Sequence, residues 1–215
     1  MKIGFWLLLY LLLTTNVFAQ WEELPDSSSG QWTSLFNGTN LDGWHGLDSV
    51  WSVEDGAIVA RNAPYVTFLA HEAVYKNFVF SAMVKLKDNV GNSGIQYRSF
   101  VSDSSKWKVA GYQANIKEKF SEQQGWGDLY EEGGRGWVKF AETKTKKTIL
   151  MGDWNLYQIM ADGNHLTHRI NGVTWLEYTE MNNNQRKEGI FALQHHGGPP
   201  IEILFKDIKV LRLPP

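Results

Sequence analysis

The chain of 215 residues contains no cysteine. This absence excludes disulfide bonds, thiolate metal sites, a cysteine nucleophile and a lipidated N-terminal cysteine. The sequence also has no large excess of positive or negative residues: the formal net charge is −2 and the isoelectric point is near 6.3. Neither nucleic acid nor an anionic membrane is therefore expected as a partner. The sequence has no glycine-rich phosphate loop and no Gly-x-Ser-x-Gly nucleophile elbow. Phosphate transfer and serine-hydrolase chemistry therefore have no support.

Long apolar runs are lacking except near the N-terminus. Residues Phe5–Leu13 are wholly apolar, Lys2 is the only charged residue among the first twenty-one, and residues 17–19 have the small-x-small character of a signal-peptidase site. A membrane-spanning helix needs about 20 apolar residues, and this run is about half as long. We therefore expect residues 1–19 to be a cleaved signal peptide and residues 20–31 a polar, mobile leader. The mature protein is expected to be periplasmic or secreted, with no membrane attachment.

From residue 32 onward the sequence has the alternation typical of β-strands, interrupted by turn residues at short intervals. Asp55-Gly56 and Asn171-Gly172 are typical of two-residue hairpins. No stretch keeps apolar residues at helical spacing for three turns. About a dozen strands without βαβ alternation predict an all-β fold, an antiparallel β-sandwich formed by one domain over residues 32–215. Residues 118–148 are the least regular part, and we expect long loops there.

Three of the expected strands carry long polar side chains at alternate positions. Because side chains alternate across a strand, the polar members of each strand share one face. Amide, guanidinium and imidazole groups suit sugar hydroxyls, which both donate and accept hydrogen bonds. The alternative is an ordinary solvent-facing sheet surface, although such surfaces are usually richer in Lys, Glu, Thr and Ser. If the three strands are neighbours, the residues that form this polar surface are Gln96, Arg98, Gln113, Asn115, Gln194 and His196.

Tryptophans near these strands are candidates to stack on a sugar ring. Trp107, Trp126 and Trp137 lie between or beside the polar segments in the sequence. Aromatic rings offer a flat apolar face together with a polar edge. The polar surface and Trp126 are therefore the expected binding residues for a saccharide ligand.

A set of short motifs occurs in one order along the chain. The motifs are Leu35-Phe-Asn-Gly38 with Leu41-Asp-Gly-Trp44, Trp51-Ser-Val-Glu-Asp-Gly56, Asn92-Ser-Gly-Ile-Gln-Tyr-Arg98, Gly111-Tyr-Gln-Ala-Asn-Ile116, Gly127-Asp-Leu-Tyr-Glu-Glu132, Gly152-Asp-Trp-Asn155 and Leu193-Gln-His-His-Gly197. In this combination the chain resembles the 3-keto-disaccharide hydrolase domain family, a group of bacterial exported glycosyl hydrolases, over residues 32–211. The resemblance implies a concanavalin-like jelly roll, in agreement with the alternation. It also implies cleavage of glycosides whose sugar carries a ketone at C3.

The implied reaction is an elimination followed by hydration. A ketone at C3 acidifies the proton on C2, and the glycosidic oxygen on C1 is then β to the carbanion. The reaction needs a base, a group that stabilises the C3 oxygen and an acid for the leaving oxygen. Within the matched motifs, His196 is implied as base or metal ligand and Glu132 as acid or metal ligand. Tyr130 is a candidate donor to the C3 oxygen, and the alternative is a packed aromatic whose hydroxyl is satisfied elsewhere. His195 has the opposite strand parity and is the weaker candidate.

One motif departs from the family. Many relatives continue Gly-Tyr-Gln-Ala with Asp, whereas this chain has Asn115. An amide cannot act as a base and is a poor ligand for a hard cation. The alternative to an enzyme is therefore a non-catalytic carbohydrate-binding module, unless Glu118 or Asp128 supplies the carboxylate. A structural or interaction domain is a third interpretation, favoured if the chain's own loops bury the polar surface.

The sequence specifies no cofactor. The resemblance leaves open a divalent metal ion, which as a Lewis acid could stabilise the developing charge on the C3 oxygen. No set of residues in the sequence identifies that metal or its ligands.

Overall fold

The computed structural model describes residues 21, 31–118, 125–141, 148–198 and 200–215. Residues 1–19, and all of the expected leader except residues 21 and 31, lie outside this part of the chain, so the signal peptide and the leader stay predictions. Among the described residues, no helix has both the length and the apolar character that a membrane span requires.

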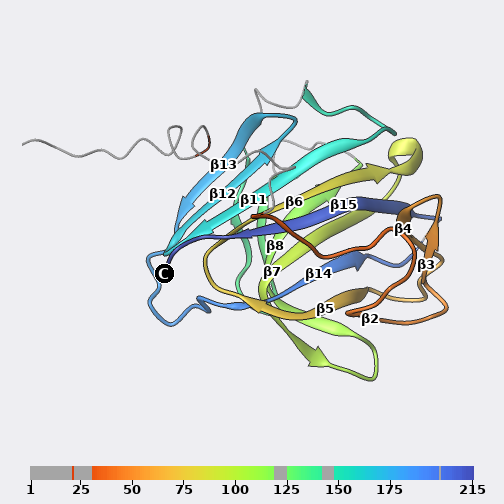
Figure 1. Ribbon diagram of the computed structural model, residues 1–215, viewed down its shortest axis with the longest axis horizontal. Coiled ribbons are helices and arrows are strands. Elements are labelled where there is room, and N and C mark those ends of the chain that lie inside the picture. Colours follow the sequence, from red (N-terminus) through yellow and green to blue (C-terminus); the bar gives the residue numbers. More distant parts are fainter. Residues whose placement is uncertain (1–20, 22–30, 119–124, 142–147, 199) are drawn as a thin grey trace, which may run out of the picture. The chain divides into compact units, whose positions relative to one another are not determined.

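Two antiparallel sheets account for all the strands of the described region (Figure 1). We call the first sheet A. Its order is β13 (Val173–Thr179), β12 (His165–Ile170), β11 (Asn155–Asp162), β6 (Phe78–Leu86), β15 (Glu202–Arg212), β4 (Ala57–Arg61) and β3 (Trp51–Glu54), with β1 (Thr33–Ser34) also paired to β15. A 3₁₀ turn, η1 (Lys87–Asn89), follows β6.

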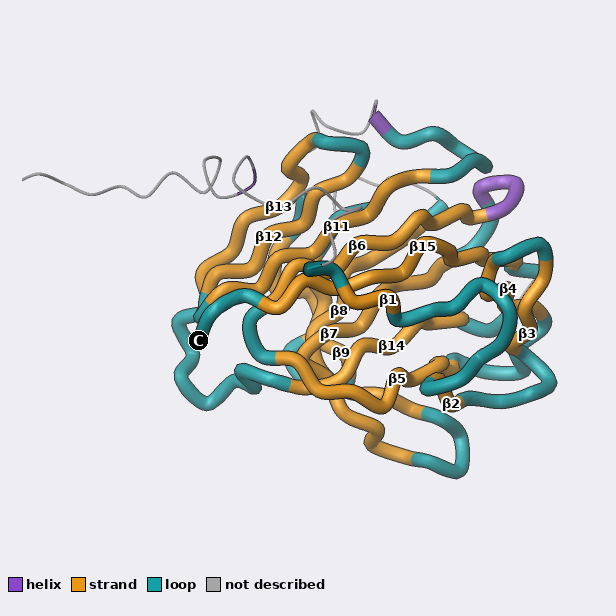
Figure 2. The backbone as a smooth tube through the Cα atoms, viewed as in Figure 1, coloured by secondary structure: helices purple, strands orange, loops and turns teal. Residues whose placement is uncertain are grey.

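The second sheet, sheet B, lies across from sheet A in Figure 2. Its order is β10 (Gly136–Lys139), β9 (Leu129–Glu132), β8 (Lys108–Lys117), β7 (Asn92–Asp103), β14 (Gly189–His195), β5 (Thr67–Tyr75) and β2 (Trp44–His45). The prediction of two stacked antiparallel sheets, and hence of a β-sandwich, is confirmed.

Apolar side chains from both sheets meet between the layers and form the core. Phe78 and Phe80 of β6 are fully buried. Phe191 of β14 packs against them across the sandwich, with ring centroids 4.7 Å and 4.8 Å away. Such aromatic pairs add to the free energy gained by burying apolar area. Because the inner faces supply the core, the outer face of sheet B remains available for polar side chains.

Both expected two-residue hairpins are present. Asp55 and Gly56 connect β3 to β4, and Asn171 and Gly172 connect β12 to β13. Their φ angles are 48°, 74°, 49° and 79°. These positive angles are required by the type I′ turn, which Asn or Asp followed by Gly adopts readily.

The expectation of long loops over residues 118–148 is only partly correct. β9 and β10 form a hairpin that adds two strands to the edge of sheet B beside β8. Each strand has four residues, which is too short for alternation to stand out in the sequence. Residues 119–124 and 142–147 lie outside the described part of the chain. The hairpin matters because it brings Tyr130 and Glu132 to the outer face of sheet B.

Candidate functional site

The outer face of sheet B carries polar side chains from three adjacent strands, β8, β7 and β14. The register places Gln113 opposite Gln96, and Asn115 opposite Gly94. On the other side of β7, Gly94 also pairs with Gln194. All four polar residues are 3% exposed or less, although they lie on the side of the sheet away from the core. We call Gln96, Gln113, Asn115 and Gln194 the polar floor.

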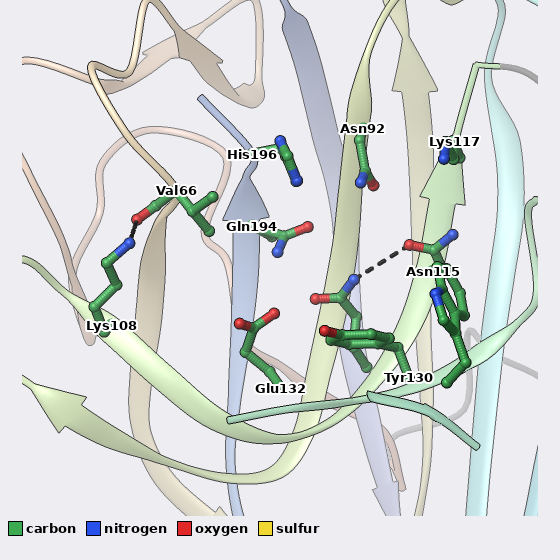
Figure 3. Close-up of a pocket in the computed structure, with 11 residues that line it drawn as sticks. Val66, Asn92, Lys108, Asn115, Lys117, Tyr130, Glu132, Gln194 and His196 are labelled. Atoms are coloured by element: carbon green, nitrogen blue, oxygen red, sulfur yellow. Dashed lines mark hydrogen bonds between the residues drawn. The ribbon is translucent and has the colours of Figure 1, made fainter. Parts of the chain in front are cut away.

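A hollow of about 380 Å³ lies above the polar floor. Its size is in the range of small-molecule sites. Figure 3 shows side chains from the surrounding strands around this hollow, with His196 and Glu132 on opposite sides of Gln194. The described loops leave the hollow open to solvent, although the floor residues themselves are 3% exposed or less. The residues that line it are Val66, Asn92, Lys108, Gln113, Asn115, Lys117, Tyr130, Glu132, Trp137, Gln194 and His196. Gln96 is not among them, so the expectation that it binds the ligand directly is corrected: it is fully buried and supports Gln113 from below.

A chain of hydrogen bonds fixes the amides of the polar floor. Ser99 Oγ donates to Gln96 Oε1 at 3.0 Å, and Gln96 Nε2 donates to Gln113 Oε1 at 2.8 Å. Gln113 Nε2 then donates to Asn115 Oδ1 at 3.2 Å, the contact dashed in Figure 3, and Asn115 Nδ2 donates to the Gly125 carbonyl at 2.8 Å. Because each amide accepts through oxygen and donates through nitrogen, its orientation is determined. The floor is thus ordered before any ligand binds.

Gly94 makes room for this arrangement. It lies between Asn115 and Gln194 in the register. A Cβ atom at this position would lie 2.5 Å from Cδ of Gln113. Only glycine therefore allows the Gln113 side chain to lie across strand β7.

Two buried amide oxygens at the hollow lack a hydrogen-bond partner among the described residues. They are Oε1 of Gln194 and Oδ1 of Asn92. A buried acceptor without a donor costs about 1–3 kcal/mol, so groups of this kind usually meet water or a ligand. Hydroxyl groups are suitable donors, and a sugar carries several. These two oxygens are the feature of the hollow that most directly indicates a polyhydroxyl ligand.

Glu132 and Tyr130 alternate along β9 and both line the hollow. Burial raises the pKa of Glu132, although the ammonium group of Lys108 offsets part of this rise. Burial also raises the pKa of Tyr130, and the nearby Glu132 carboxylate raises it further. A raised carboxyl pKa favours the protonated form, which can donate a proton.

Salt bridges hold the β9–β10 hairpin in place. Arg135, which lies in the turn between β9 and β10, forms an ion pair with Glu131. Its Nη2 also donates to Oε2 of Glu180 at 2.6 Å, and the Tyr112 hydroxyl donates to the same oxygen at 2.7 Å. Arg135 therefore does not pair with Glu132. Glu131 and Arg135 act on the site indirectly, by fixing the hairpin that carries Tyr130 and Glu132.

The two histidines at the end of β14 differ in orientation, as strand parity predicts. His195 is fully buried. The Gly197 amide donates to its Nδ1 at 3.0 Å, so its Nε2–H group donates to the Ile201 carbonyl at 3.1 Å. His196 instead lines the hollow, above Gln194 in Figure 3. Its side chain is exposed to solvent.

The surroundings of His196 favour its neutral form. Partial burial lowers the pKa of the imidazole, and the positive charges of Lys117 and Lys108 lower it further. A neutral imidazole can accept a proton near neutral pH. The pKa of His196 is thus lowered while that of Glu132 is raised, and such opposite shifts are typical of a base and an acid that share a site.

Arg98 does not belong to the polar floor, which corrects the expectation from strand parity. The β7–β8 register shifts between Tyr97 and Phe100, and Arg98 has a φ angle of 47°. This β-bulge turns the side chain away from the hollow. The guanidinium instead donates from Nε and Nη2 to the Lys76 carbonyl, at 3.0 Å and 2.8 Å. Strict alternation fails here because a bulge inserts one residue.

Trp126 also does not line the hollow. It is 2% exposed, belongs to the core, and stacks on Tyr157 of β11 with a centroid distance of 6.4 Å. The expectation that Trp126 binds the sugar is therefore corrected. Trp137 of β10 lines the hollow instead, with its ring edge-on to Tyr130 at 5.0 Å.

The carboxylates considered as replacements for the missing Asp are both engaged elsewhere. Asp128 is buried and accepts hydrogen bonds from the backbone amides of Gly125 and Ala141, at 2.6 Å and 2.7 Å. Glu118 accepts one from the Gly91 amide. Neither lines the hollow. Both stabilise backbone segments near the site.

Asn115→Asp is expected to destabilise the protein as pH rises. The variant loses the donor to the Gly125 carbonyl and places a carboxylate oxygen beside that carbonyl. The charged form is disfavoured, so the folded-state pKa of the new Asp is raised and the loss appears as pH rises through it. We expect the free energy of unfolding to fall by about 1–3 kcal/mol at pH 8 and by less at pH 5.

Urea denaturation at the two pH values measures this effect. Asn184→Asp, at an exposed position, is the matched control and should change stability little at either pH. Unchanged stability together with increased turnover would instead mean that the hollow of this protein lacks a carboxylate that its chemistry uses.

The donor set of the hollow does not fit a divalent cation. Among the described residues, no three His, Cys, Asp or Glu groups lie close enough together to hold a metal ion. The lining offers one carboxylate, Glu132, and one imidazole, His196, together with the ammonium groups of Lys108 and Lys117. Divalent cations are usually held by several carboxylates or imidazoles, and nearby ammonium groups repel them. We therefore assign no step to a metal.

Sequence reasoning missed two lining residues that parity could have identified. Asn92 has the same parity as Gly94 and Gln96, and Lys117 has the same parity as Asn115. Both occupy the strand ends at the edge of the hollow. Lys108 could not be found in this way, because a register shift separates it from the floor residues of β7.

Comparison with known proteins relates the chain to a carbohydrate-active family. A family model described as the 3-keto-alpha-glucoside-1,2-lyase-like domain matches residues 31–211. No curated protein matches the chain.

Several solved structures share the fold. A "putative glycosyl hydrolase" from Parabacteroides distasonis ATCC 8503 is 20% identical, with a TM-score of 0.66 over 89% of this chain and 98% of that chain. A second protein so named, from the same organism, is 22% identical, with a TM-score of 0.63 over 85% and 99%. The carbohydrate-binding module CBM66 from Bacillus subtilis is 17% identical, with a TM-score of 0.60 over 83% and 99%. At these identities the likeness establishes the β-sandwich fold.

Proposed function

The chain belongs to the 3-keto-alpha-glucoside-1,2-lyase-like domain family, and from this premise we propose that it is an exported enzyme that cleaves 3-keto-glycosides in the hollow above the polar floor. One observation carries the proposal. His196, with a lowered pKa, and Glu132, with a raised pKa, line one hollow, and the part of its lining that the structure describes contains no other carboxylate. Ordinary glycosidases need two carboxylates beside the scissile bond, whereas an elimination needs one base and one acid.

The first half of the reaction is an elimination. The neutral imidazole of His196 removes the proton from C2, and the electron pair passes into the C3 carbonyl to give an enolate. The Tyr130 hydroxyl donates to the enolate oxygen, and the positive charges of Lys108 and Lys117 stabilise it further. The C1–O bond then breaks as the C1–C2 double bond forms, and protonated Glu132 gives its proton to the leaving oxygen.

The second half adds water to the resulting enone. The Glu132 carboxylate takes a proton from water as the oxygen bonds to C1, and His196 returns its proton to C2. Both residues then have their initial protonation states, and the net change is hydrolysis. The hydroxyls of the sugar donate to the unpaired oxygens of Gln194 and Asn92, which positions C2 relative to His196.

Release of sugar from a 3-keto-disaccharide tests the proposal. The purified mature protein is incubated with the substrate, and the unoxidised disaccharide, which lacks the acidic C2 proton, is the control. We expect release only from the keto compound. Because the donor set does not fit a divalent cation, we also expect EDTA to leave the rate unchanged. No release with or without added metal would refute the enzyme proposal.

Asn115 favours a second candidate, a non-catalytic carbohydrate-binding module of the same fold. Its amide belongs to the hydrogen-bonded polar floor and supplies neither a general base nor a negative charge. Calorimetry with unmodified oligosaccharides separates the two candidates. A binding module should bind them without turnover, whereas the enzyme should prefer the keto compounds.

A further inference from the structure

Aromatic side chains continue the hollow above the polar floor, which we call the first hollow, toward the edge of sheet B. Tyr130 of β9 and Trp137 of β10 pair directly in the register, and both line the first hollow. Their rings meet edge-on, with centroids 5.0 Å apart. The ring of Phe140, which follows β10, has its centroid 5.5 Å from that of Trp137 and is tilted by 33°. We call Tyr130, Trp137 and Phe140 the aromatic ladder.

One row of the register joins the ladder to the polar floor. Gln113 of the floor pairs with Tyr130 across β8 and β9, and Tyr130 pairs with Trp137 across β9 and β10. Paired residues of neighbouring strands share one face of the sheet, and the next residue of β10, Val138, packs against the core instead. Neighbouring strands are about 4.8 Å apart, so Trp137 lies about 10 Å from Gln113 across the sheet. Because all three residues of this row line the first hollow, the path from the floor to the ladder stays inside one hollow.

The first hollow has a polar half and an aromatic half. The two unpaired oxygens, Oε1 of Gln194 and Oδ1 of Asn92, belong to β14 and β7. The ladder lies along β9 and β10, on the other side of β8. The polar half therefore offers acceptors to sugar hydroxyls, whereas the aromatic half suits a flat apolar surface.

The proposed reaction determines which half takes which part of the substrate. His196 directly follows β14 and must reach C2 of the reacting sugar, so this sugar occupies the polar half. Glu132 must reach the leaving oxygen, and Figure 3 shows it beside Tyr130, across the hollow from His196. Glu132 is also a diagonal neighbour of Trp137, the partner of Tyr130, and Cα atoms in such pairs are about 7–8 Å apart. The group attached to the leaving oxygen therefore extends from Glu132 over the ladder, away from His196.

The outer end of the ladder is open to solvent. Phe140 is 42% exposed, and Trp137 is partly exposed. Exposed apolar surface of this kind, next to polar groups, is typical of ligand-binding grooves. A ring that stacks here covers the apolar surface, and hydroxyls on its outer side stay in water.

We propose that the aromatic ladder binds the leaving group of the glycoside, and that this group begins with a ring that has a flat apolar face. A pyranose and an aromatic ring share this chemistry, since either can stack on an indole or a phenyl ring. The proposal rests on the proposed function, because it assigns the leaving group of the same reaction. Its consequence is a preference for glycosides with a ring on the leaving oxygen over glycosides with a small alkyl group there.

Calorimetry with matched glycosides tests the ladder. The protein carries His196→Ala to slow turnover, and the ligands are methyl 3-keto-glucoside, phenyl 3-keto-glucoside and a 3-keto-disaccharide of one anomeric configuration. We expect at least one ring-bearing ligand to bind about tenfold more tightly than the methyl compound, a gain that stacking on an aromatic side chain allows. The ligand that gains identifies the ring as a sugar or an aromatic. Equal affinities for all three ligands would overturn the proposal.

Trp137→Ala and Phe140→Ala locate the stacking. The readout is the ratio of the ring-bearing affinity to the methyl affinity, because Trp137 also lines the first hollow and its removal affects both ligands. Trp137→Ala should bring this ratio close to one. Phe140→Ala, at an exposed position with little risk to folding, should lower the ratio in the same direction by a smaller factor. A ratio that survives both substitutions would show that the ring binds elsewhere and that the proposal is wrong.

Phe100→Ala is the matched control for Phe140→Ala. Phe100 is 40% exposed and lines a second hollow, over parts of β2, β5, β7 and β14, whose lining does not include the ladder among the residues that the structure describes. The control should keep the full ratio. Loss of the ratio in Phe100→Ala, with its retention in Phe140→Ala, would place the ring in the second hollow and refute the proposal.

Turnover by the wild-type protein separates this proposal from the proposed function. Release of methanol from methyl 3-keto-glucoside requires the reaction but not the ladder. Methanol release together with equal affinities would retain the enzyme and refute the ladder. Tighter binding of a ring-bearing ligand without turnover, lost in Trp137→Ala, would refute the enzyme and retain the ladder as part of a binding site. Absence of both turnover and binding would refute both proposals.

Discussion

His196→Ala is expected to lower kcat on a 3-keto-disaccharide by roughly 10²–10⁴-fold, the usual contribution of a positioned general base. The imidazole of His196 lines the hollow with a lowered pKa, whereas the neighbouring His195, the last residue of β14, is buried and engaged in hydrogen bonds with the backbone. No second imidazole of the lining can take its place. The side chain is exposed, so its removal should leave the melting temperature nearly unchanged. Steady-state kinetics and thermal denaturation measure the two quantities.

Two controls make this result specific. His165→Ala removes an exposed imidazole from β12 of sheet A and should leave kcat unchanged. Added imidazole should restore part of the activity of His196→Ala, because the vacated space lies in an open hollow. Full activity of His196→Ala would remove this residue from the mechanism, and loss without rescue would favour a positioning role.

Glu132→Gln is expected to lower kcat by about 10²-fold on a 3-keto-disaccharide, because the amide cannot protonate the leaving oxygen. The effect should depend on the leaving group. A 4-nitrophenyl 3-keto-glucoside releases a stable anion that needs no proton, so its release in the first turnover, before the hydration step that also uses Glu132, should slow only a few-fold. Single-turnover kinetics of leaving-group release from the two substrates measure the difference. An equal loss on both would mean that Glu132 does not act as the acid.

The pH profile gives a second measurement of the same variant. The active form of wild type has neutral His196 and protonated Glu132, so kcat/KM should be bell-shaped. The rise with pH comes from loss of the imidazolium proton. At higher pH kcat/KM falls, because His196 and Glu132 are then both deprotonated and no acid remains to protonate the leaving oxygen. Glu132→Gln should therefore keep the rise and lose the fall, whereas Glu177→Gln, at an exposed position, should keep both.

Alternation predicted much of the site because the strands that build it are regular. Gln96, Gln113, Asn115 and Gln194 each lie where parity along one strand places them. The period of two is a local property of the extended backbone, so it can be read without knowledge of the strand partners. The same reasoning failed at Arg98, because a bulge depends on the pairing with the neighbouring strand. The bulge gives this residue its positive φ angle and its contact with Lys76.

The aromatic residues show the same difference between positions in regular strands, which the sequence predicts, and positions that depend on tertiary structure. Strand parity places Tyr97 and Tyr112 in the core, and the structure has both there. Trp107, Trp126 and Trp137 lie in or beside turns, where no period applies. Burial in the core (Trp126), partial burial beside His45 (Trp107) and contact with the first hollow (Trp137) are therefore equally compatible with the local sequence. Only the path of each loop over the sheets separates them.

The sequence by itself determined the all-β class, the two type I′ hairpins and the polar face of the central strands, because these depend on neighbouring positions along one chain segment. Tertiary structure decided which groups face one another across the hollow. It added the β9–β10 hairpin that brings Glu132 opposite His196, and it engaged Asp128 in backbone contacts. It also produced the opposite pKa shifts of His196 and Glu132. Desolvation and the charges of Lys108 and Lys117 arise only when segments distant in sequence come within a few ångströms of one another.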